Sequence, residues 1–287
     1  MGFMTPEKTV SVAWDGTEAS PRWRELLRRP TFVISAGILV FWISAAIGWR
    51  WIVDPFSNSG TKFGQPSVDH PFGTDFYGRD VLARVLAGAE PAMLVGPAGA
   101  VLAAVAATLL GLTSGYFRGP FDALMMRVFD VFLVLPPIIM LIVVVSAVGA
   151  SPPAMIVIVA IVYTPTIARI IRAAVLTQRD KPYVAAARLQ GEGRRRIMVT
   201  EILPNILPTV VVQAVLNLGY AIFVISSLSF LGLAAQPPSP DWGLAISDNR
   251  LYLQTAWWTL AFPAASLASV VISVMLFADN LKEVYDR

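Results

Sequence analysis

Residue types that commonly carry out catalysis are scarce in this chain. His70 is the only histidine and there is no cysteine, so thiolate nucleophiles and structural disulfides are excluded, and one imidazole is too few ligands for a metal site. No Gly-Lys dipeptide occurs, which excludes the loop that cradles nucleotide phosphates. Asp130 and Asp279 lie near the ends of apolar runs without the sequence context of an intramembrane enzyme. We therefore expect no catalytic site, no metal and no cofactor bound by this chain.

The chemically distinctive stretch is a polar segment, residues 182–204, between two long apolar runs. Residues 131–168 before it and 202–240 after it contain no charged residue. Both runs can cross a bilayer, whereas the polar segment cannot lie in lipid. We expect a loop that works outside the membrane.

A short helix is predicted at the start of this segment. Pro182 suits its first turn, Asp180 can cap it, and Gly191 suits the left-handed residue that ends it. Its small side chains, which another protein could approach closely, are Ala185, Ala186 and Ala187. Because so short a helix is marginal in water on its own, we expect a protein partner to hold it.

A second helix is predicted near Gly193. Its first turn would carry Arg194, Arg195 and Arg196, at the end where the helix dipole disfavours cations. This placement indicates anions outside the chain, either lipid phosphates or an acidic protein surface.

Together these residues resemble the cytoplasmic coupling loop of ATP-binding-cassette import permeases. The family pattern is Glu-Ala-Ala, three residues, Gly, nine residues, then Ile-x-Leu-Pro, and the residues in register here are Ala186, Ala187, Gly191, Leu203 and Pro204. The sequence departs from the pattern at Ala185, where the family has Glu, and at Glu201, where it has Ile. The resemblance implies that Ala185, Ala186, Ala187, Gly191, Arg194, Arg195, Glu201 and Pro204 form the ATPase-coupling site.

The composition is that of an integral membrane protein. Apolar residues make up 56% of the chain and charged residues 14%, against about 25% charged residues in soluble domains. Runs of about twenty apolar residues predict six transmembrane helices in an all-α polytopic protein. The expected divisions are a cytoplasmic N-terminal tail (1–29), a first span (30–53), an extracytoplasmic loop with an amphipathic segment (54–90), a core with spans two to six (91–279) that contains the coupling loop (176–204), and a cytoplasmic C-terminal tail (280–287).

Several polar residues are expected within or at the ends of the spans. Asp130 needs a partner so near the membrane, and Arg127 lies three residues earlier on the same helical face, so we expect these two to pair, with a gating role as the alternative. Pro136-Pro137 should kink the third span. The uncharged polar groups Gln213, Asn217 and Ser226 are predicted to bond a neighbouring helix, and lining a wet pathway is their alternative role.

The segment before the second span and the loop after the fifth resemble the oligopeptide and dipeptide branch of the same permeases. The first reads Gly73-Thr74-Asp75 and Gly78-Arg79-Asp80, and the second contains Ser229-Phe230-Leu231-Gly232-Leu233 followed by residues 237–243. We expect the acids and Arg79 to satisfy one another, His70 to be a solvated loop residue, and Trp257 and Trp258 to lie at a membrane interface.

The basic residues favour one orientation. With both termini and the coupling loop on one side, that side holds 17 of the 22 lysines and arginines, and the positive-inside rule makes it cytoplasmic. Because these basic residues flank apolar spans, nucleic-acid binding is not expected.

The resemblance implies a type I importer permease fold and a function in ATP-driven uptake of peptides. The implied partners are a homologous permease subunit, two ATP-binding subunits that carry ATP and Mg²⁺, an extracytoplasmic substrate-binding protein and the lipid bilayer of a bacterial inner (plasma) membrane. Import of nickel or another small solute by the same machinery is the first alternative. An ion-driven secondary transporter is the more remote one, since it would leave the polar coupling loop unexplained.

Overall fold

Helices make up nearly all the regular structure of residues 26–285, the part of the chain that this computed structural model describes. The outer helices and the first half of the core are α2 (Pro30–Ile52), α3 (Val81–Ala87), α4 (Ala89–Phe117), α5 (Gly119–Val134), α6 (Pro137–Val148) and α7 (Pro152–Arg179). The second half contains α8 (Pro182–Leu189), α9 (Arg194–Arg196), a π-helical turn (Ile197–Ile202), α10 (Leu203–Phe230), α11 (Trp242–Asn249), a 3₁₀ turn (Arg250–Tyr252) and α12 (Trp258–Tyr285).

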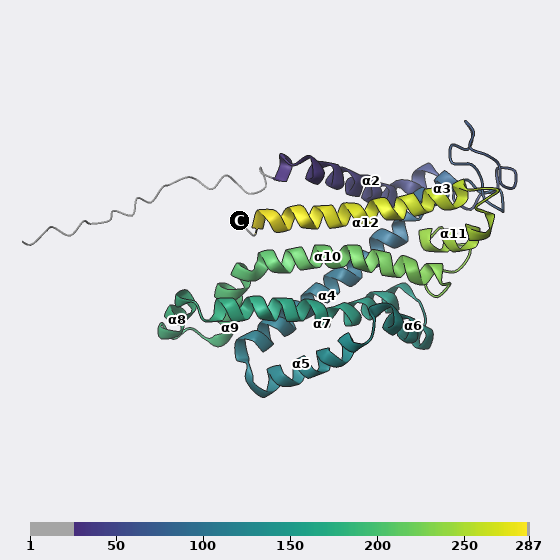
Figure 1. Cartoon of the computed structure of the whole chain (residues 1–287). Coiled ribbons are helices and arrows are strands. Elements are labelled where there is room, and N and C mark those ends of the chain that lie inside the picture. The colour runs from purple at the N-terminus through teal and green to yellow at the C-terminus, as the bar shows by residue number, and fades with distance from the viewer. Residues whose placement is uncertain (1–25, 286–287) are drawn as a thin grey trace, which may run out of the picture.

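The long helices lie side by side. Figure 1 shows the order α2, α12, α10, α7 and α5 across the bundle, with α4 crossing behind them, and each neighbouring pair in this order is in contact. The start of α2, the turn from α4 to α5, helices α8 and α9, and the end of α12 gather at one end of the bundle. The loop after α2, helix α3 and helix α11 gather at the other end.

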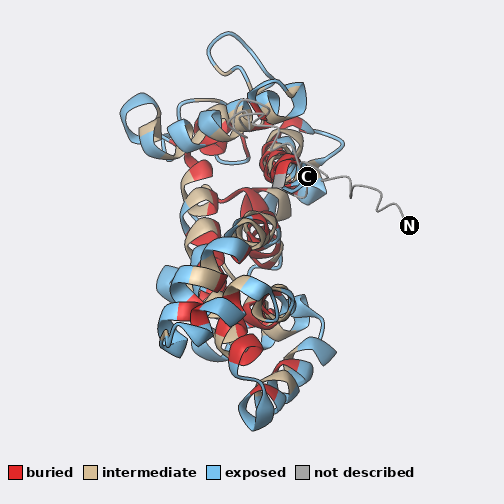
Figure 2. Cartoon of the chain, turned by 90° about the vertical axis from the view of Figure 1, so that its left-hand side faces the viewer, coloured by how far each residue is buried: buried red, intermediate tan, exposed pale blue. Residues whose placement is uncertain are grey.

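The lengths and apolar surfaces of these helices match the predicted polytopic membrane fold. Among residues 26–285, five helical stretches are long and apolar enough to span a bilayer, and α5 with α6 makes a sixth if the two count as one broken span. These two helices meet at 89° beside Pro136 and Pro137, which confirms the predicted kink. Figure 2 shows buried residues on the faces where helices meet, while outward faces are exposed. Large apolar side chains such as Trp51 and Val134, exposed by 81% and 78%, lie on these outward faces.

The tightest packing joins α4 to α7, the most extensive helix contact in the described chain. Along α4, small buried residues recur at every fourth position, namely Gly99, Ala103, Ala107, Gly111 and Gly115. A Cβ atom added at Gly111 would lie 2.7 Å from the carbonyl oxygen of Ala168 on α7. Small residues at this spacing allow close backbone approach in membranes, where no hydrophobic force drives helices together.

The last two spans differ in how they begin. The fifth belongs to a continuous helical stretch that begins at Arg194, whereas the sixth begins at Trp258, after the 3₁₀ turn Arg250–Tyr252. Trp258 is 4% exposed, and its indole N–H donates to the carbonyl oxygen of Thr74 over 3.2 Å. Trp258 therefore packs within the protein, whereas Trp257 is 52% exposed. The expected position of both at a membrane interface stays a prediction. The predicted N-terminal tail lies mostly outside the described residues.

The close approach of α4 and α7 can be tested with two matched glycine substitutions. Gly111→Ala would insert a methyl group against a backbone oxygen, whereas Gly37→Ala in α2 would meet nothing within 4 Å. Both changes gain the same helix propensity, so their difference isolates the overpacking strain, which we expect to lower the free energy of unfolding by about 1–3 kcal/mol. Thermal unfolding of the two purified variants in detergent measures this difference. Equal stabilities would contradict the inferred packing.

Candidate functional site: the coupling loop and the polar clusters

Helix α8 forms where the polar segment predicts it, with Pro182 in its first turn. Gly191 has φ +80° and ends the helix. Its N–H donates to Arg188 O and the N–H of Glu192 donates to Ala187 O, each over 3.1 Å, which is the hydrogen-bond pattern of a Schellman motif. The left-handed conformation expected of Gly191 is confirmed. The predicted cap is wrong, because Lys181 occupies the N-cap position without a side-chain bond and Asp180 instead pairs with Arg118 over 3.3 Å.

The two faces of α8 have different surroundings. Val184 and Ala187 are 0% and 7% exposed and pack into a cluster with residues of α4, α7 and the π-helical turn. The exposed face carries Ala185, Ala186 and Leu189, the last 90% exposed. Ala187 therefore faces the chain's own core and is not available to a partner, contrary to expectation. Sequence reasoning missed Leu189, although it lies three to four residues after the exposed alanines and so on the same helical face.

The helix after the loop begins with the arginines, as predicted. Arg194 and Arg195 are exposed, and Arg196 Nε lies 3.4 Å from Glu192 Oε1. The π-helical turn Ile197–Ile202 follows directly. It precedes Pro204, which has no N–H and whose ring crowds the carbonyl one turn earlier, and such a widened turn relieves that conflict. Glu201 is half-buried within the turn and accepts a hydrogen bond from Thr200 Oγ1 over 3.3 Å, while Pro204 is exposed.

Ion pairs fasten α5 to α7 at the same end of the bundle. Arg172 donates from Nε to one oxygen of Asp122 and from Nη2 to the other, each over 2.5 Å. Arg169 pairs with Asp130. The predicted partner of Asp130, Arg127, is therefore wrong, because the tertiary fold brings a cation from α7 against α5.

The polar residues of α10 are packed within the bundle. Asn217 and Ser226 are 6% and 5% exposed. Asn217 Nδ2 donates to Gln213 O over 3.2 Å, within the same helix, so the expected bond to a neighbouring helix is not seen for this group. The backbone oxygen of Ser226 lies so close to Gly243 of α11 that an added Cβ there would be 2.1 Å away. Roles of Gln213, Asn217 and Ser226 in a pathway stay predictions.

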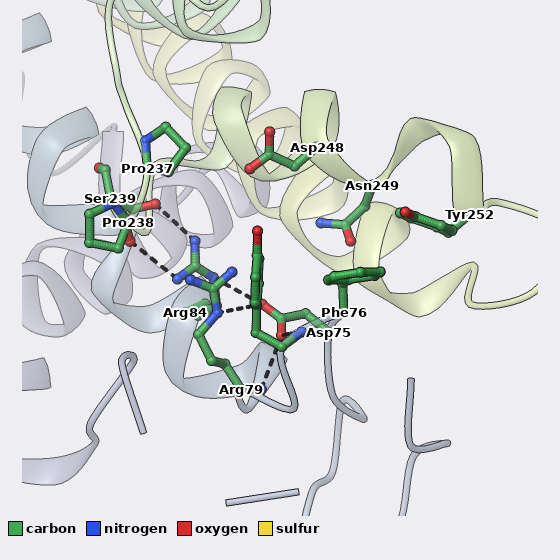
Figure 3. Close-up of a pocket in the computed structure, with 11 residues that line it drawn as sticks. Asp75, Phe76, Arg79, Arg84, Pro237, Pro238, Ser239, Asp248, Asn249 and Tyr252 are labelled. Atoms are coloured by element: carbon green, nitrogen blue, oxygen red, sulfur yellow. Dashed lines mark hydrogen bonds and ion pairs between the residues drawn. The ribbon is translucent and has the colours of Figure 1, made fainter. Parts of the chain in front are cut away.

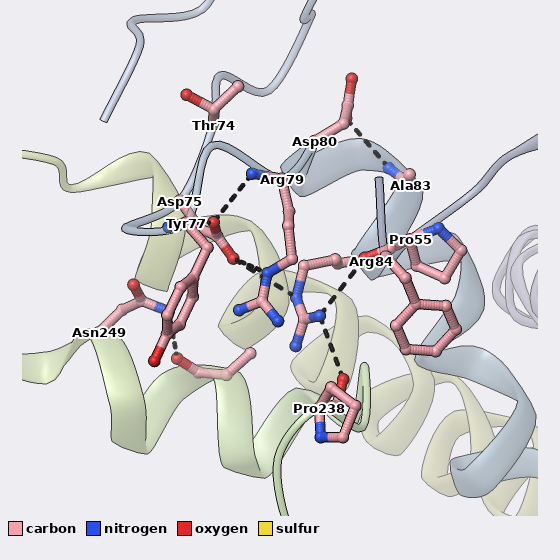
Figure 4. Close-up of polar contacts among 12 residues, drawn as sticks. Pro55, Thr74, Asp75, Tyr77, Arg79, Asp80, Ala83, Arg84, Pro238 and Asn249 are labelled. Atoms are coloured by element: carbon pink, nitrogen blue, oxygen red, sulfur yellow. Dashed lines mark hydrogen bonds and ion pairs between the residues drawn. The ribbon is translucent and has the colours of Figure 1, made fainter. Parts of the chain in front are cut away.

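At the opposite end, a charged cluster around Asp75 and Arg84 joins the segment before α4 to Pro55, in the loop after α2, and to Pro238, in the loop before α11 (Figure 4). Asp75 accepts hydrogen bonds from the backbone of Tyr77 and Arg79 and from Arg79 Nε, the last over 2.7 Å. Arg84 is 6% exposed and donates to Ser239 O over 2.8 Å. Asp75 and Arg79 pair as expected, whereas Asp80 accepts a hydrogen bond from the backbone N–H of Ala83 at the start of α3. His70 is not simply solvated, since its Nδ1 lies 2.9 Å from Asp80 Oδ2, and no cluster of metal-binding side chains occurs among the described residues.

A cavity of about 520 Å³ opens beside this cluster (Figure 3). Phe76, Tyr77 and Tyr252 supply aromatic surface, and Arg79 and Asp248 supply charges of opposite sign. Burial raises the pKa of the Asp248 carboxyl, and the nearby guanidinium groups of Arg84, Arg79 and Arg250 partly offset the rise. Sequence patterns indicated the Asp75 side of this cavity but not that α11 closes it.

Comparison with known proteins agrees with this architecture. The family described as binding-protein-dependent transport system inner membrane component matches residues 107–287. A putative peptide transport system permease protein of Brucella suis biovar 1 (strain 1330) is 36% identical over 92% of this chain and 90% of its own length. The dipeptide transport system permease protein DppC of Alkalihalophilus pseudofirmus is 35% identical over 99% of this chain and 96% of its own. The probable D,D-dipeptide transport system permease protein DdpC of Escherichia coli (strain K12) is 35% identical over 90% and 87%.

A double-mutant cycle tests whether Asp122 and Arg172 brace the site. Asp122 has a side chain only 10% exposed and Arg172 one 27% exposed, so we expect alanine substitutions to show a coupling energy of about 1–3 kcal/mol. The control cycle uses Arg118 and Asp180, whose side chains are 49% and 64% exposed and whose coupling should be below about 1 kcal/mol. Thermal unfolding in detergent gives both values. A coupling energy no larger for Asp122 and Arg172 than for the control pair would show that this ion pair does not hold α5 against α7.

Proposed function

Since this chain belongs to the family of inner membrane components of binding-protein-dependent transport systems, we propose that it forms half of a translocation pathway for peptides and is moved by ATPase subunits through α8. The observation that carries this proposal is the exposed face of Ala185, Ala186 and Leu189 on a short helix that protrudes at one end of the bundle (Figure 1). Leu189, 90% exposed, and the two alanines form a small apolar face outside the spans, which is the kind of helix face that docks into a protein groove.

The packing of α8 supports a mechanical role. Val184 and Ala187 fix α8 in the same cluster as Tyr116 of α4 and Val175 of α7. Interiors packed in this way transmit displacement instead of absorbing it. When the groove of an ATPase subunit displaces α8, the ends of α4 and α7 therefore move with it. Alternating access follows if the two permease subunits rotate against each other as the two ATPase subunits close.

The proposed assembly contains a homologous permease subunit, two ATP-binding subunits that hold ATP and Mg²⁺, and an extracytoplasmic substrate-binding protein. This chain is its non-catalytic membrane subunit. Relatives described as peptide and dipeptide permeases across at least 90% of this chain favour peptides over nickel or another small solute. The same family membership favours ATP-driven over ion-driven transport.

In the proposed orientation α8 and both termini lie in the cytoplasm, beneath a bacterial inner membrane. Arg118, Arg172, Arg179, Arg188 and Arg194 gather with α8 at one end of the bundle, and this basic end is the one that the positive-inside rule assigns to the cytoplasm.

Uptake by the reconstituted complex tests the coupling role of α8. Ala186 is exposed, so Ala186→Trp should leave membrane insertion near normal but abolish ATP-driven uptake, because the indole blocks close approach of the groove. Ala185→Glu, which restores the family residue, should retain uptake. Ala187→Trp is a different test, since it would disturb the chain's own packing.

The loop's end can be tested in the same assay. Gly191→Val places a β-branched residue at φ +80°, which costs at least about 1–2 kcal/mol, and it should redirect the helix end and abolish uptake. Gly191→Asn is the matched control, because asparagine tolerates this conformation, and it should keep most activity. Normal uptake by both Ala186→Trp and Gly191→Val would exclude α8 as the coupling element.

The orientation can be measured with single cysteines, because the chain has none of its own. Ser59 lies in the exposed loop after α2 and Thr177 is exposed near the end of α7. In whole cells with a permeable outer wall, an impermeant thiol reagent should label Ser59→Cys and leave Thr177→Cys unlabelled until the cells are opened. The reverse pattern would overturn the orientation.

A further inference from the structure

A second cavity, of about 420 Å³, lies at the α8 end of the bundle. Its wall combines the end of α4 (Tyr116 and Phe117), the end of α7 (Arg179), helix α8 (Arg188) and the start of the next helix (Arg194), together with Glu192 and Ile197. Four helices thus contribute to one small space, and the three consecutive helices α7, α8 and α9 each contribute an arginine.

The charges around this cavity do not balance. Three guanidinium groups face one carboxylate, and that carboxylate, on Glu192, is shared with Arg196 at 3.4 Å. Within residues 26–285, Arg179, Arg188 and Arg194 form no ion pair. By contrast, Arg118, Arg169 and Arg172 at the same end each pair with an aspartate. Three arginines without an ion pair thus line this one cavity.

The guanidinium group of Arg179 is the most constrained of the three. Its Nε and Nη1 atoms are shielded from solvent and have no hydrogen-bond acceptor, although an unsatisfied buried donor costs about 1–3 kcal/mol, and more when charged. Arg179 and Arg188 lie over the ring of Tyr116, 5.9 and 5.6 Å from its centroid. An aromatic face attracts cations but does not neutralise them, and Glu192 supplies the one carboxylate among the residues that line this cavity.

We propose that this cavity binds a phosphate group, and that the bound phosphate ties α8 to the ends of α4 and α7. Guanidinium groups recognise phosphate through paired N–H donors, and three arginines around one cavity supply more donors than a carboxylate could use. The phosphate could come from the headgroup of an anionic lipid or from a free phosphate ion. Phe117, which lines the cavity at the end of α4, is 45% exposed, so exposed apolar surface at the end of a span adjoins the site.

The proposal adds regulation to the coupling role and does not depend on it. Arg188 belongs to α8, whereas Arg179 belongs to α7. An anion between them relieves their repulsion and makes α8 harder to displace from the bundle. Anionic lipid or phosphate would then stiffen the connection between the exposed face of α8 and the spans.

Hydrogen exchange of the chain in lipid nanodiscs tests this site without requiring transport. We expect backbone amides of residues 188–197 to exchange several-fold more slowly in nanodiscs that contain phosphatidylglycerol than in pure phosphatidylcholine nanodiscs. A second arm adds inorganic phosphate to the phosphatidylcholine nanodiscs. Protection only by phosphatidylglycerol identifies a lipid headgroup, and protection by inorganic phosphate as well identifies a site that accepts a free anion.

Three variants separate the site from general electrostatics. Arg179→Gln should abolish the protection, and Arg188→Gln, at an exposed position, should weaken it even if Arg179→Gln folds poorly. Arg127→Gln on α5 removes an exposed arginine outside the cavity and should keep the full protection. Absence of protection in both arms, equal protection in Arg179→Gln, or protection that appears only when ATPase subunits are added would overturn the proposal.

Discussion

The close approach of α4 to α7 is the contact on which the rest of the bundle depends. It is made by small residues at every fourth position of α4, which let the two backbones come together without large side chains between them. The cluster that this contact creates also contains Val184, Ala187 and Ile197. The short helix α8, which would be marginal alone in water, is therefore held by the same packing that joins two membrane spans.

Charge is arranged differently at the two ends of the molecule. At the end that contains α3 and α11, Asp75 pairs with Arg79 and Arg84, and Arg84 donates to a nearby backbone oxygen. The indole N–H groups of Trp242 and Trp258 donate to backbone oxygens of neighbouring segments. This network rigidifies a surface beside a cavity. At the α8 end, two aspartates secure α5 to α7 while three arginines around Tyr116 are left without acidic partners. The charged cluster around Asp75 is thus paired within the chain, whereas the arginines of the α8 end are available to bind other molecules.

The proposed coupling and phosphate sites lie on neighbouring faces of one short helix. The exposed side carries Ala185, Ala186 and Leu189, and Arg188 reaches toward the cavity. Gly191 allows the chain to turn sharply between Arg188 and Arg194, because its left-handed conformation closes the Schellman motif. Both sites therefore depend on the same backbone turn, and binding at either site affects the position of α8.

The sequence by itself determined the class of fold, the kink at Pro136 and Pro137, and the start and end of α8, because these depend on local composition and on the fixed preferences of proline and glycine. It also indicated the coupling loop through motif spacing. The tertiary structure decided which groups face one another. Local spacing predicted an ion pair between Asp130 and Arg127, whereas the structure pairs Asp130 with Arg169 of α7. The motif predicted that Ala187 contacts the ATPase partner, whereas in the folded helix its side chain packs into the core. Local patterns show neither that α4 packs against α7 nor that Tyr116 lies beneath Arg179 and Arg188, because both contacts join parts of the chain that are far apart in sequence.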